Sequence, residues 1–135
     1  MRDPGEMLEE FEAIMEELRE LARESVILVE GRKDRCALER LGVSGEIVQV
    51  QDARGILGVA EELASRRRSA VILTDWDRKG GQLAELLRNA LRSCDVPYDD
   101  GIRMKMAVLG KKDIKDVESL PAFANLLEER RRAVR

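Results

Sequence analysis

Two short apolar runs in this chain each end in acidic residues that are followed by a glycine. The first run, Ser25 to Val29, leads into Glu30 and Gly31, and the second, Val71 to Thr74, leads into Asp75-Trp76-Asp77, with Gly80 shortly after. Short runs rich in β-branched residues predict buried strands. If the two strands are neighbours in a parallel sheet, these carboxylates meet at its carboxyl edge, where open α/β sheets bind ligands.

A metal ion is the expected occupant of such a group of carboxylates. Ionised carboxylates repel one another, and a cation between them removes the conflict. Magnesium prefers oxygen ligands and is typically held by one or two carboxylates, with water and substrate phosphates completing its shell. The sequence therefore predicts a magnesium site, with manganese as a substitute ion, and chemistry on phosphates.

The two motifs together resemble the Toprim domain of topoisomerases, primases, recombination proteins and some nucleases. That family has a strand ending in Glu-Gly, here Glu30-Gly31, and then a strand ending in Asp-x-Asp-x-x-Gly, here Asp75, Asp77 and Gly80. Their separation of roughly 45 residues leaves room for two crossovers of a βαβ fold. The chain is most similar to small stand-alone Toprim proteins, including the ribonuclease that matures 5S ribosomal RNA, and to primase-type Toprim domains.

The resemblance implies an α/β fold, a single three-layer, Rossmann-like domain whose mainly parallel four-stranded sheet is flanked by helices. We expect an amphipathic helix at residues 1–24, the Toprim domain at residues 25–120 and a C-terminal helix at residues 121–135. The strands before Glu30 and Asp75 are expected to be neighbours. A turn is predicted from Pro97 to Gly101, and a fourth strand from Ile102 to Leu109, where apolar side chains alternate.

The resemblance assigns the metal to Glu30, Asp75 and Asp77, and it implies that Glu30 acts as a general acid or base. Three further acids, Asp34, Asp116 and Glu118, are additional candidates, although the last two are equally suited to begin a closing helix. Phosphates are expected at cations and glycines beside the motifs, including free backbone N–H groups at Gly80 and Gly81. The candidate phosphate-binding residues are Gly31, Lys33, Arg78, Lys79, Gly80, Lys111 and Lys112.

The function indicated by these residues is magnesium-dependent phosphodiester chemistry on nucleic acid, DNA or RNA, in the form of a Toprim-type nuclease. Two alternatives stay open: nucleotidyl transfer of the primase kind, and a nucleic-acid-binding or scaffold module without catalysis. A phosphatase of the haloacid dehalogenase type also uses Asp-x-Asp, but there the motif normally follows the first strand. The single tyrosine, Tyr98, lies in the predicted turn, away from both motifs, and is not expected to be a nucleophile.

Composition excludes several other classes of protein. The 135 residues contain no histidine and only two cysteines, so a structural zinc site is not expected, and Cys36 is predicted to lie in the core. No apolar run approaches the roughly 20 residues that cross a bilayer, which favours a cytoplasmic protein that does not enter membranes. The net charge of −3 is unusual for a nucleic-acid binder, so local clusters of cations must supply the attraction.

The first 24 residues form an amphipathic pattern that begins with Asp3-Pro4, a typical helix start. Apolar residues recur at helical spacing, and glutamates occupy the opposite face. The simpler interpretation is that this helix covers one face of the sheet. The alternative is that it forms a homodimer or docks a protein partner. The residues of the predicted apolar stripe are Met7, Leu8, Phe11, Ile14, Met15, Leu18, Leu21 and Ala22.

Overall fold

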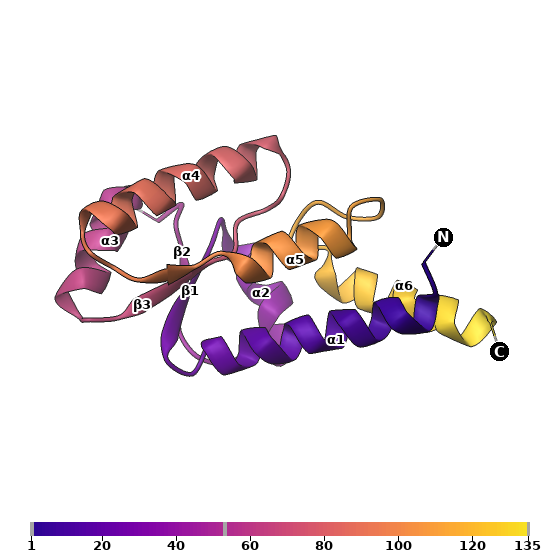
Figure 1. Cartoon of the computed structure of the whole chain (residues 1–135). Coiled ribbons are helices and arrows are strands. Elements are labelled where there is room, and N and C mark those ends of the chain that lie inside the picture. The colour runs from indigo at the N-terminus through magenta and orange to yellow at the C-terminus, as the bar shows by residue number, and fades with distance from the viewer. Residues whose placement is uncertain (1, 53, 135) are drawn as a thin grey trace.

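The computed structural model describes residues 2–52 and 54–134, and within them it contains a four-stranded sheet with helices on both faces (Figure 1). The spatial order of the strands is β2-β1-β3-β4, and all three pairings are parallel. The predicted Rossmann-like α/β architecture is therefore confirmed, and the described sheet is wholly parallel. The strands are β1 (Ser25–Val29), β2 (Ile47–Gln49), β3 (Ser69–Ile72) and β4 (Tyr98–Asp99).

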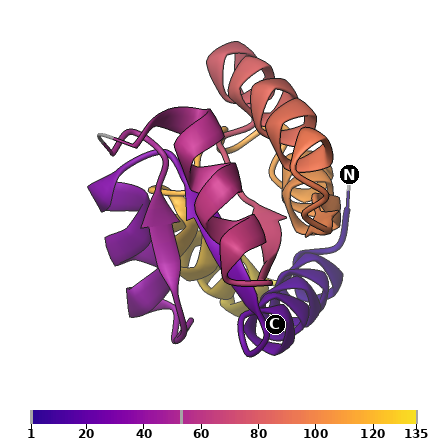
Figure 2. The same ribbon diagram turned by 90° about the vertical axis from the view of Figure 1, so that its left-hand side faces the viewer.

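Six helices in the described residues enclose this sheet as two outer layers. Helices α3 and α4 cover one face, and α1, α2, α5 and α6 cover the other. Figures 1 and 2 show α1 and α6 on the same side of the strands, where they contact each other. The helices are α1 (Pro4–Leu21), α2 (Arg32–Arg40), α3 (Gly55–Ser65), α4 (Arg78–Ser93), α5 (Gly101–Leu109) and α6 (Leu120–Ala133).

Each face of the sheet has its own hydrophobic core, because successive side chains along a strand point to opposite faces. All five residues of β1 are buried, so this strand serves both cores. One of these cores, which we call the first core, lies between the sheet and α1, α2, α5 and α6. Leu8, Phe11 and Leu18 of α1 are buried in it, so the predicted role of the N-terminal helix in covering the sheet is confirmed. That core takes Ile27, Val29, Val71 and Leu73 from the sheet segments, and the second takes Val26, Leu28, Ala70 and Ile72.

The predicted adjacency of the two motif strands is confirmed. β1 pairs directly with β3, with Leu28 opposite Ile72. Just beyond that pair, the N–H of Leu73 donates to the carbonyl oxygen of Leu28 at 2.9 Å. Because parallel strands run in the same direction, the chain leaves both of them at the same edge of the sheet. Glu30 and Asp75 thereby reach this edge side by side.

The predicted fourth strand is wrong. The segment expected to be a turn contains β4, which includes Tyr98, and the segment expected to be a strand is helix α5. Ile102, Met106 and Leu109 are buried at helical spacing, whereas Met104 is exposed. The apolar residues of this segment fit the two-residue repeat of a strand as well as the 3.6-residue repeat of a helix. Packing of α5 against the first core determines that the segment is a helix.

Candidate functional site

Glu30 and Asp75 are the centre of the candidate site. Their backbones lie at the ends of neighbouring strands, and Oε2 of Glu30 accepts a hydrogen bond from the backbone N–H of Asp75 at 2.9 Å. Glu30 is 7% exposed although it is charged in its ordinary state. A carboxylate is rarely buried so deeply unless it is paired or serves a purpose. The sheet therefore brings the first acid of each predicted motif together.

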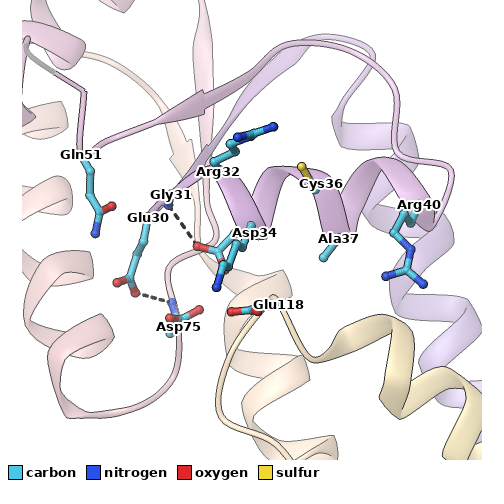
Figure 3. Close-up of a pocket in the computed structure, with 11 residues that line it drawn as sticks. Glu30, Gly31, Arg32, Asp34, Cys36, Ala37, Arg40, Gln51, Asp75 and Glu118 are labelled. Atoms are coloured by element: carbon cyan, nitrogen blue, oxygen red, sulfur yellow. Dashed lines mark hydrogen bonds between the residues drawn. The ribbon is translucent and has the colours of Figure 1, made fainter.

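Two more acids complete a cluster that we call the acidic cluster: Glu30, Asp34, Asp75 and Glu118. Asp34 belongs to the first turn of α2, where its Oδ2 accepts from the N–H of Gly31 at 3.1 Å. Glu118 arrives from the segment between α5 and α6. Figure 3 shows these four side chains gathered from four separate segments. All four line one cavity of about 730 Å³.

Burial and repulsion by nearby carboxylates raise the pKa values of two members of the acidic cluster, Asp75 and Asp34. The pKa of Asp75 is raised to about 7, chiefly by burial; the N–H of Val117 opposes the rise, and nearby Asp34 and Glu30 add to it. The pKa of Asp34 is also raised, again mainly by burial, with its hydrogen bond from Gly31 acting in the opposite direction. Carboxyls with raised pKa values in one cavity mark it as a candidate functional site.

The segment from Gly110 to Ser119 is fastened to the second motif by several hydrogen bonds. The N–H of Val117 donates to Oδ1 of Asp75 at 3.0 Å, and Nε1 of Trp76 donates to the carbonyl oxygen of Ile114 at 2.9 Å. The prediction that this segment returns to the acidic edge is confirmed. Its two candidate acids differ, because Oδ1 of Asp116 accepts from the N–H of Ser119, at the start of α6, whereas Glu118 lines the cavity.

Asp77 and the glycines of the second motif build the start of α4. Oδ1 of Asp77 accepts from the N–H of Gly80 at 2.7 Å, and the carbonyl oxygen of Asp77 accepts from the N–H of Gly81. The prediction that these two N–H groups are free is therefore wrong, because the side chain of Asp77 caps the first and the first backbone hydrogen bond of α4 uses the second. Gly80 is required for packing, since a Cβ atom there would lie 1.9 Å from the carbonyl oxygen of Asp75.

Asp77 does not line the cavity that holds the acidic cluster. As the side chains of the described residues stand, no three acidic or cysteine side chains are grouped closely enough to hold a metal ion. The predicted metal site made of Glu30, Asp75 and Asp77 stays a prediction. Among these three, the structure brings together Glu30 and Asp75, and it gives Asp77 a role as helix cap.

Arg103 is a residue of this site that sequence reasoning missed. Its Nε donates to the carbonyl oxygen of Thr74 at 3.1 Å, and its Nη2 donates to that of Asp75 at 2.9 Å. Burial lowers the pKa of this guanidinium, and the neighbouring charge of Arg88 lowers it further. Arg103 lies on α5, the segment predicted to be a strand, so the pattern gave no indication that it points at the second motif.

Among the cations predicted to bind phosphates, Lys33 lines the cavity of the acidic cluster and the others do not. Lys33 lines the cavity together with Arg32 and Arg40, which were not among the predicted phosphate-binding residues. Gly31 also lines it, whereas Arg78, Lys79, Lys111 and Lys112 are exposed residues of the start of α4 and of the segment after α5. Cys36 was predicted to be in the core, but it is exposed and lines the same cavity, because α2 turns Ala37 inward instead.

The parallel sheet and the acidic residues at its carboxyl edge define a Toprim domain. A family model of the Toprim domain matches residues 25–109. The chain therefore belongs to the Toprim family, as the two motifs indicated. Helices α1 and α6 lie outside the matched residues.

Curated relatives place the chain more narrowly, among the UPF0292 proteins. It is 36% identical over 121 residues to a UPF0292 protein of Methanosarcina barkeri, covering 89% of this chain and 84% of that one. A UPF0292 protein of Pyrococcus horikoshii is 40% identical over 110 residues, covering 82% and 80%. A solved structure, described as a putative protein from Aquifex aeolicus, superimposes with a TM-score of 0.69 at 25% identity, covering 81% and 96%.

Membership in the Toprim family associates this chain with a metal-dependent function related to nucleic acids, because Toprim domains generally bind divalent metal ions. The UPF0292 relatives carry no name that describes an activity. In the part of the chain that the structure describes, no helix is both long and apolar enough to cross a lipid bilayer.

Proposed function

We propose that this protein is a magnesium-dependent nuclease that hydrolyses phosphodiester bonds. The observation that carries the proposal is the distribution of charge at the carboxyl edge of the sheet. The acidic cluster, in which the pKa values of Asp34 and Asp75 are raised, shares its cavity with cations of α2, and further cations lie in the segments that follow β3 and α5; none of them forms an ion pair with a described acidic residue. These cations are Arg32, Lys33 and Arg40 of α2, Arg78 and Lys79 of α4, and Lys111, Lys112 and Lys115 of the segment after α5.

Many cations elsewhere in the described residues are paired with acids, although Arg67, Arg92 and Arg132 are not. Arg66 pairs with Glu46 at 2.5 Å, Arg130 pairs with Asp113 at 2.9 Å, and many other arginines have similar partners. Cations without such partners remain free to bind external anions, and phosphates are the anions that a nucleic acid presents. The acids would repel these phosphates unless a metal ion lay between them. The acids and the cations together therefore support metal-dependent chemistry on a phosphate.

The oxygens of Glu30 and Asp75 fit a magnesium ion. Each carboxylate uses one oxygen to accept a backbone N–H, namely Oε2 of Glu30 and Oδ1 of Asp75. These hydrogen bonds fix the orientation of each group and leave its second oxygen available as a ligand. Asp34 and Asp77 are further candidates to hold the ion. When bound, magnesium would polarise the phosphate and stabilise the leaving oxygen.

The remaining chemistry falls to residues of the chain. Glu30 is the candidate general acid or base, because its carboxyl is buried beside the other acids and the chain has no histidine to take that role. Lys33, Arg78 and Lys79 would neutralise phosphate charge and hold the strand in place. Arg103 holds the carbonyl oxygens of Thr74 and Asp75, and thereby fixes the backbone from which Asp75 projects.

The test is cleavage of end-labelled DNA and RNA panels, single and double stranded, with magnesium, manganese or a chelator. The variants Asp75→Asn and Glu30→Gln should each lower the cleavage rate by about 10²-fold to 10⁴-fold, the range for loss of a catalytic acid or base. Asp95→Asn is the matched control, because Asp95 is exposed at the far end of α4 and its positive φ of 57° suits asparagine. Cleavage that survives Asp75→Asn or the chelator would refute the proposal.

One observation favours a second candidate, a nucleic-acid-binding module without catalysis. Asp77 is committed to capping α4, and the described acids do not form a three-membered metal site as they stand. If the wild type binds the same panels but never cuts them, with any of the ions, the binding module is correct. Incorporation of nucleotides on a single-stranded template would instead identify the primase-like alternative.

A further inference from the structure

The cavity that holds the acidic cluster extends beyond it along α2. Its wall follows one side of this helix from Lys33 through Ala37 to Arg40, at the three-residue and four-residue spacing of a helical face. Figure 3 shows Arg40 at the opposite end of α2 from Glu30 and Asp75. At 1.5 Å per residue, the distance along the axis from Lys33 to Arg40 is about 10 Å.

That distance separates groups of opposite charge within one cavity. The acidic cluster lies at one end, whereas Arg40, which forms no ion pair with a described acid, lies at the other. Because about 10 Å is several times the roughly 3.4 Å that one strand advances per nucleotide, phosphates at the two ends of the cavity belong to different nucleotides, and Arg40 is not placed on the phosphate at the acidic cluster. It is well placed for a phosphate further along the same strand.

The residues that line the cavity also limit which parts of a nucleic acid it can bind. Among the described residues that line the cavity none is aromatic, so the cavity offers no ring on which a base can stack. Its cations suit phosphates, which carry no direct sequence information. A cavity of about 730 Å³ is of the size that holds a small organic ligand. One or two nucleotides of a single strand match it better than a duplex does.

Resting on the function proposed above, we propose that α2 is a track for one strand of nucleic acid, which is bound through its backbone and independently of base sequence. The reacting phosphate lies at the acidic cluster, and a phosphate further along the strand lies on Arg40. The substrate class is therefore single-stranded nucleic acid that extends past the reacting bond. A mononucleotide would not use this track.

The first test compares Arg40→Ala with Arg92→Ala, both in an Asp75→Asn background with magnesium, so that binding is measured without cleavage. Arg92 is the matched control, because it is exposed and lies in the last turn of α4, as Arg40 lies in the last turn of α2. Binding of labelled 12-nucleotide strands is followed by fluorescence anisotropy at several salt concentrations. Arg40→Ala should weaken binding about 5-fold to 10-fold at low salt and reduce the salt slope by about 0.7, whereas Arg92→Ala should change neither.

The two native cysteines provide a second test. Cys36 is exposed on the wall of the cavity, whereas Cys94 caps the C-terminal end of α4 and does not line this cavity. A bound strand should slow the reaction of Cys36 with a maleimide by about 5-fold or more and leave Cys94 unchanged, since the track covers only the first thiol. This measurement does not depend on any substitution in α2.

Four results would overturn the track: equal losses from Arg40→Ala and Arg92→Ala, an unprotected Cys36, tighter binding of duplex than of single strand, or affinities for homopolymers of different bases that differ by about 10-fold or more. Failure of the proposed nuclease function looks different. In that case the wild type cuts nothing, while binding still depends on Arg40 and Cys36 is still protected.

Discussion

Gly80 shows, at the scale of single residues, why the second motif requires a glycine. A Cβ atom at this position would lie 1.9 Å from the carbonyl oxygen of Asp75, so the start of α4 packs directly on the backbone of that acid. In addition, Oγ1 of Thr74 donates to the carbonyl oxygen of Gly80 at 2.8 Å. The glycine therefore lets the strand end and the helix start approach closely enough to fix Asp75.

We expect Gly80→Ala to destabilise the protein by about 2 kcal/mol or more, because the clash is with backbone atoms that must shift. Gly81 is the matched control, since a Cβ atom there would meet Nη2 of Arg103 at an ordinary 3.6 Å. Gly81→Ala should stabilise the protein by about 0.5 to 1 kcal/mol, the cost of glycine inside a helix. Urea denaturation measures both, and a reversed order would contradict this account.

Asp75 should make stability depend on pH. Its pKa is raised from the ordinary 3.8 of an aspartic acid to about 7 in the folded protein, so the folded state binds the proton more tightly. Between these values the free energy of unfolding falls as pH rises, and this contribution is lost above about pH 7. Asp75→Asn cannot ionise and still accepts from the N–H of Val117. At pH 8 it should be more stable than the wild type by about 1 kcal/mol, after allowing for partial exposure.

Chemical denaturation at pH 4.5 and pH 8 tests this expectation in metal-free protein. The difference between Asp75→Asn and the wild type should be large at pH 8 and close to zero at pH 4.5, where the aspartic acid is neutral. Magnesium at pH 8 should stabilise the wild type more than the variant, since only the wild type supplies the carboxylate. A difference that is the same at both pH values would show that Asp75 titrates normally.

At the scale of elements, the sequence predicted most reliably the strands that are buried on both faces. β1 and β3 are apolar without alternation because helices cover both of their faces, and this made the two motif strands recognisable. β4 has only two residues, Tyr98 and Asp99, which is too short for any periodic pattern. α5 has apolar residues that fit period two as well as the helical period, and packing against the rest of the fold determined which one holds.

The same limits apply to the site. Glu30 and Asp75 could be predicted to meet, because strand ends have fixed positions at the edge of a sheet. The side-chain role of Asp77 could not, because a carboxylate that follows a strand can bind a metal or cap the next helix with the same spacing. Glu118 depends on the path of an irregular segment, and Arg103 depends on the correct assignment of α5.

Arg103 provides the prediction at this scale. Arg103→Met keeps the length of the side chain but removes the donors to the carbonyl oxygens of Thr74 and Asp75. The free energy of unfolding should fall by about 1 to 3 kcal/mol, because partly buried carbonyl oxygens lose their hydrogen-bond donors. Lys105→Met on the same helix is the control; Lys105 is exposed and pairs with Glu17, so its loss should cost about 1 kcal/mol or less. Equal costs for the two variants would contradict a special role for Arg103.

For the whole molecule, net charge is a poor guide to function. The chain carries −3, yet Arg32, Lys33 and Arg40, which form no ion pair with a described acid, line the cavity that holds the acidic cluster. Acids on α1, such as Glu16 and Glu20, pair with nearby arginines. A uniform basic excess is therefore unnecessary, because attraction to phosphates depends on the local potential at the site.

The two helices outside the Toprim match, α1 and α6, form one unit with the rest of the fold. Phe11 of α1 and Phe123 of α6 meet edge to face, with ring centroids 5.8 Å apart and an angle of 78° between the rings. Both side chains are buried in the first hydrophobic core. The apolar stripe of α1, considered above as a surface for a partner, is thus largely used inside the molecule.

Phe11→Ala should therefore destabilise the protein by about 3 to 5 kcal/mol, as expected when a large buried side chain leaves a cavity. Glu12→Ala on the exposed side of α1 is the control and should change stability by about 0.5 kcal/mol or less. Thermal unfolding followed by circular dichroism measures both. The midpoint of the wild type should not change with protein concentration, because α1 stabilises its own chain. If the stripe instead held a second copy together, the midpoint would rise with concentration and the cost of Phe11→Ala would depend on it.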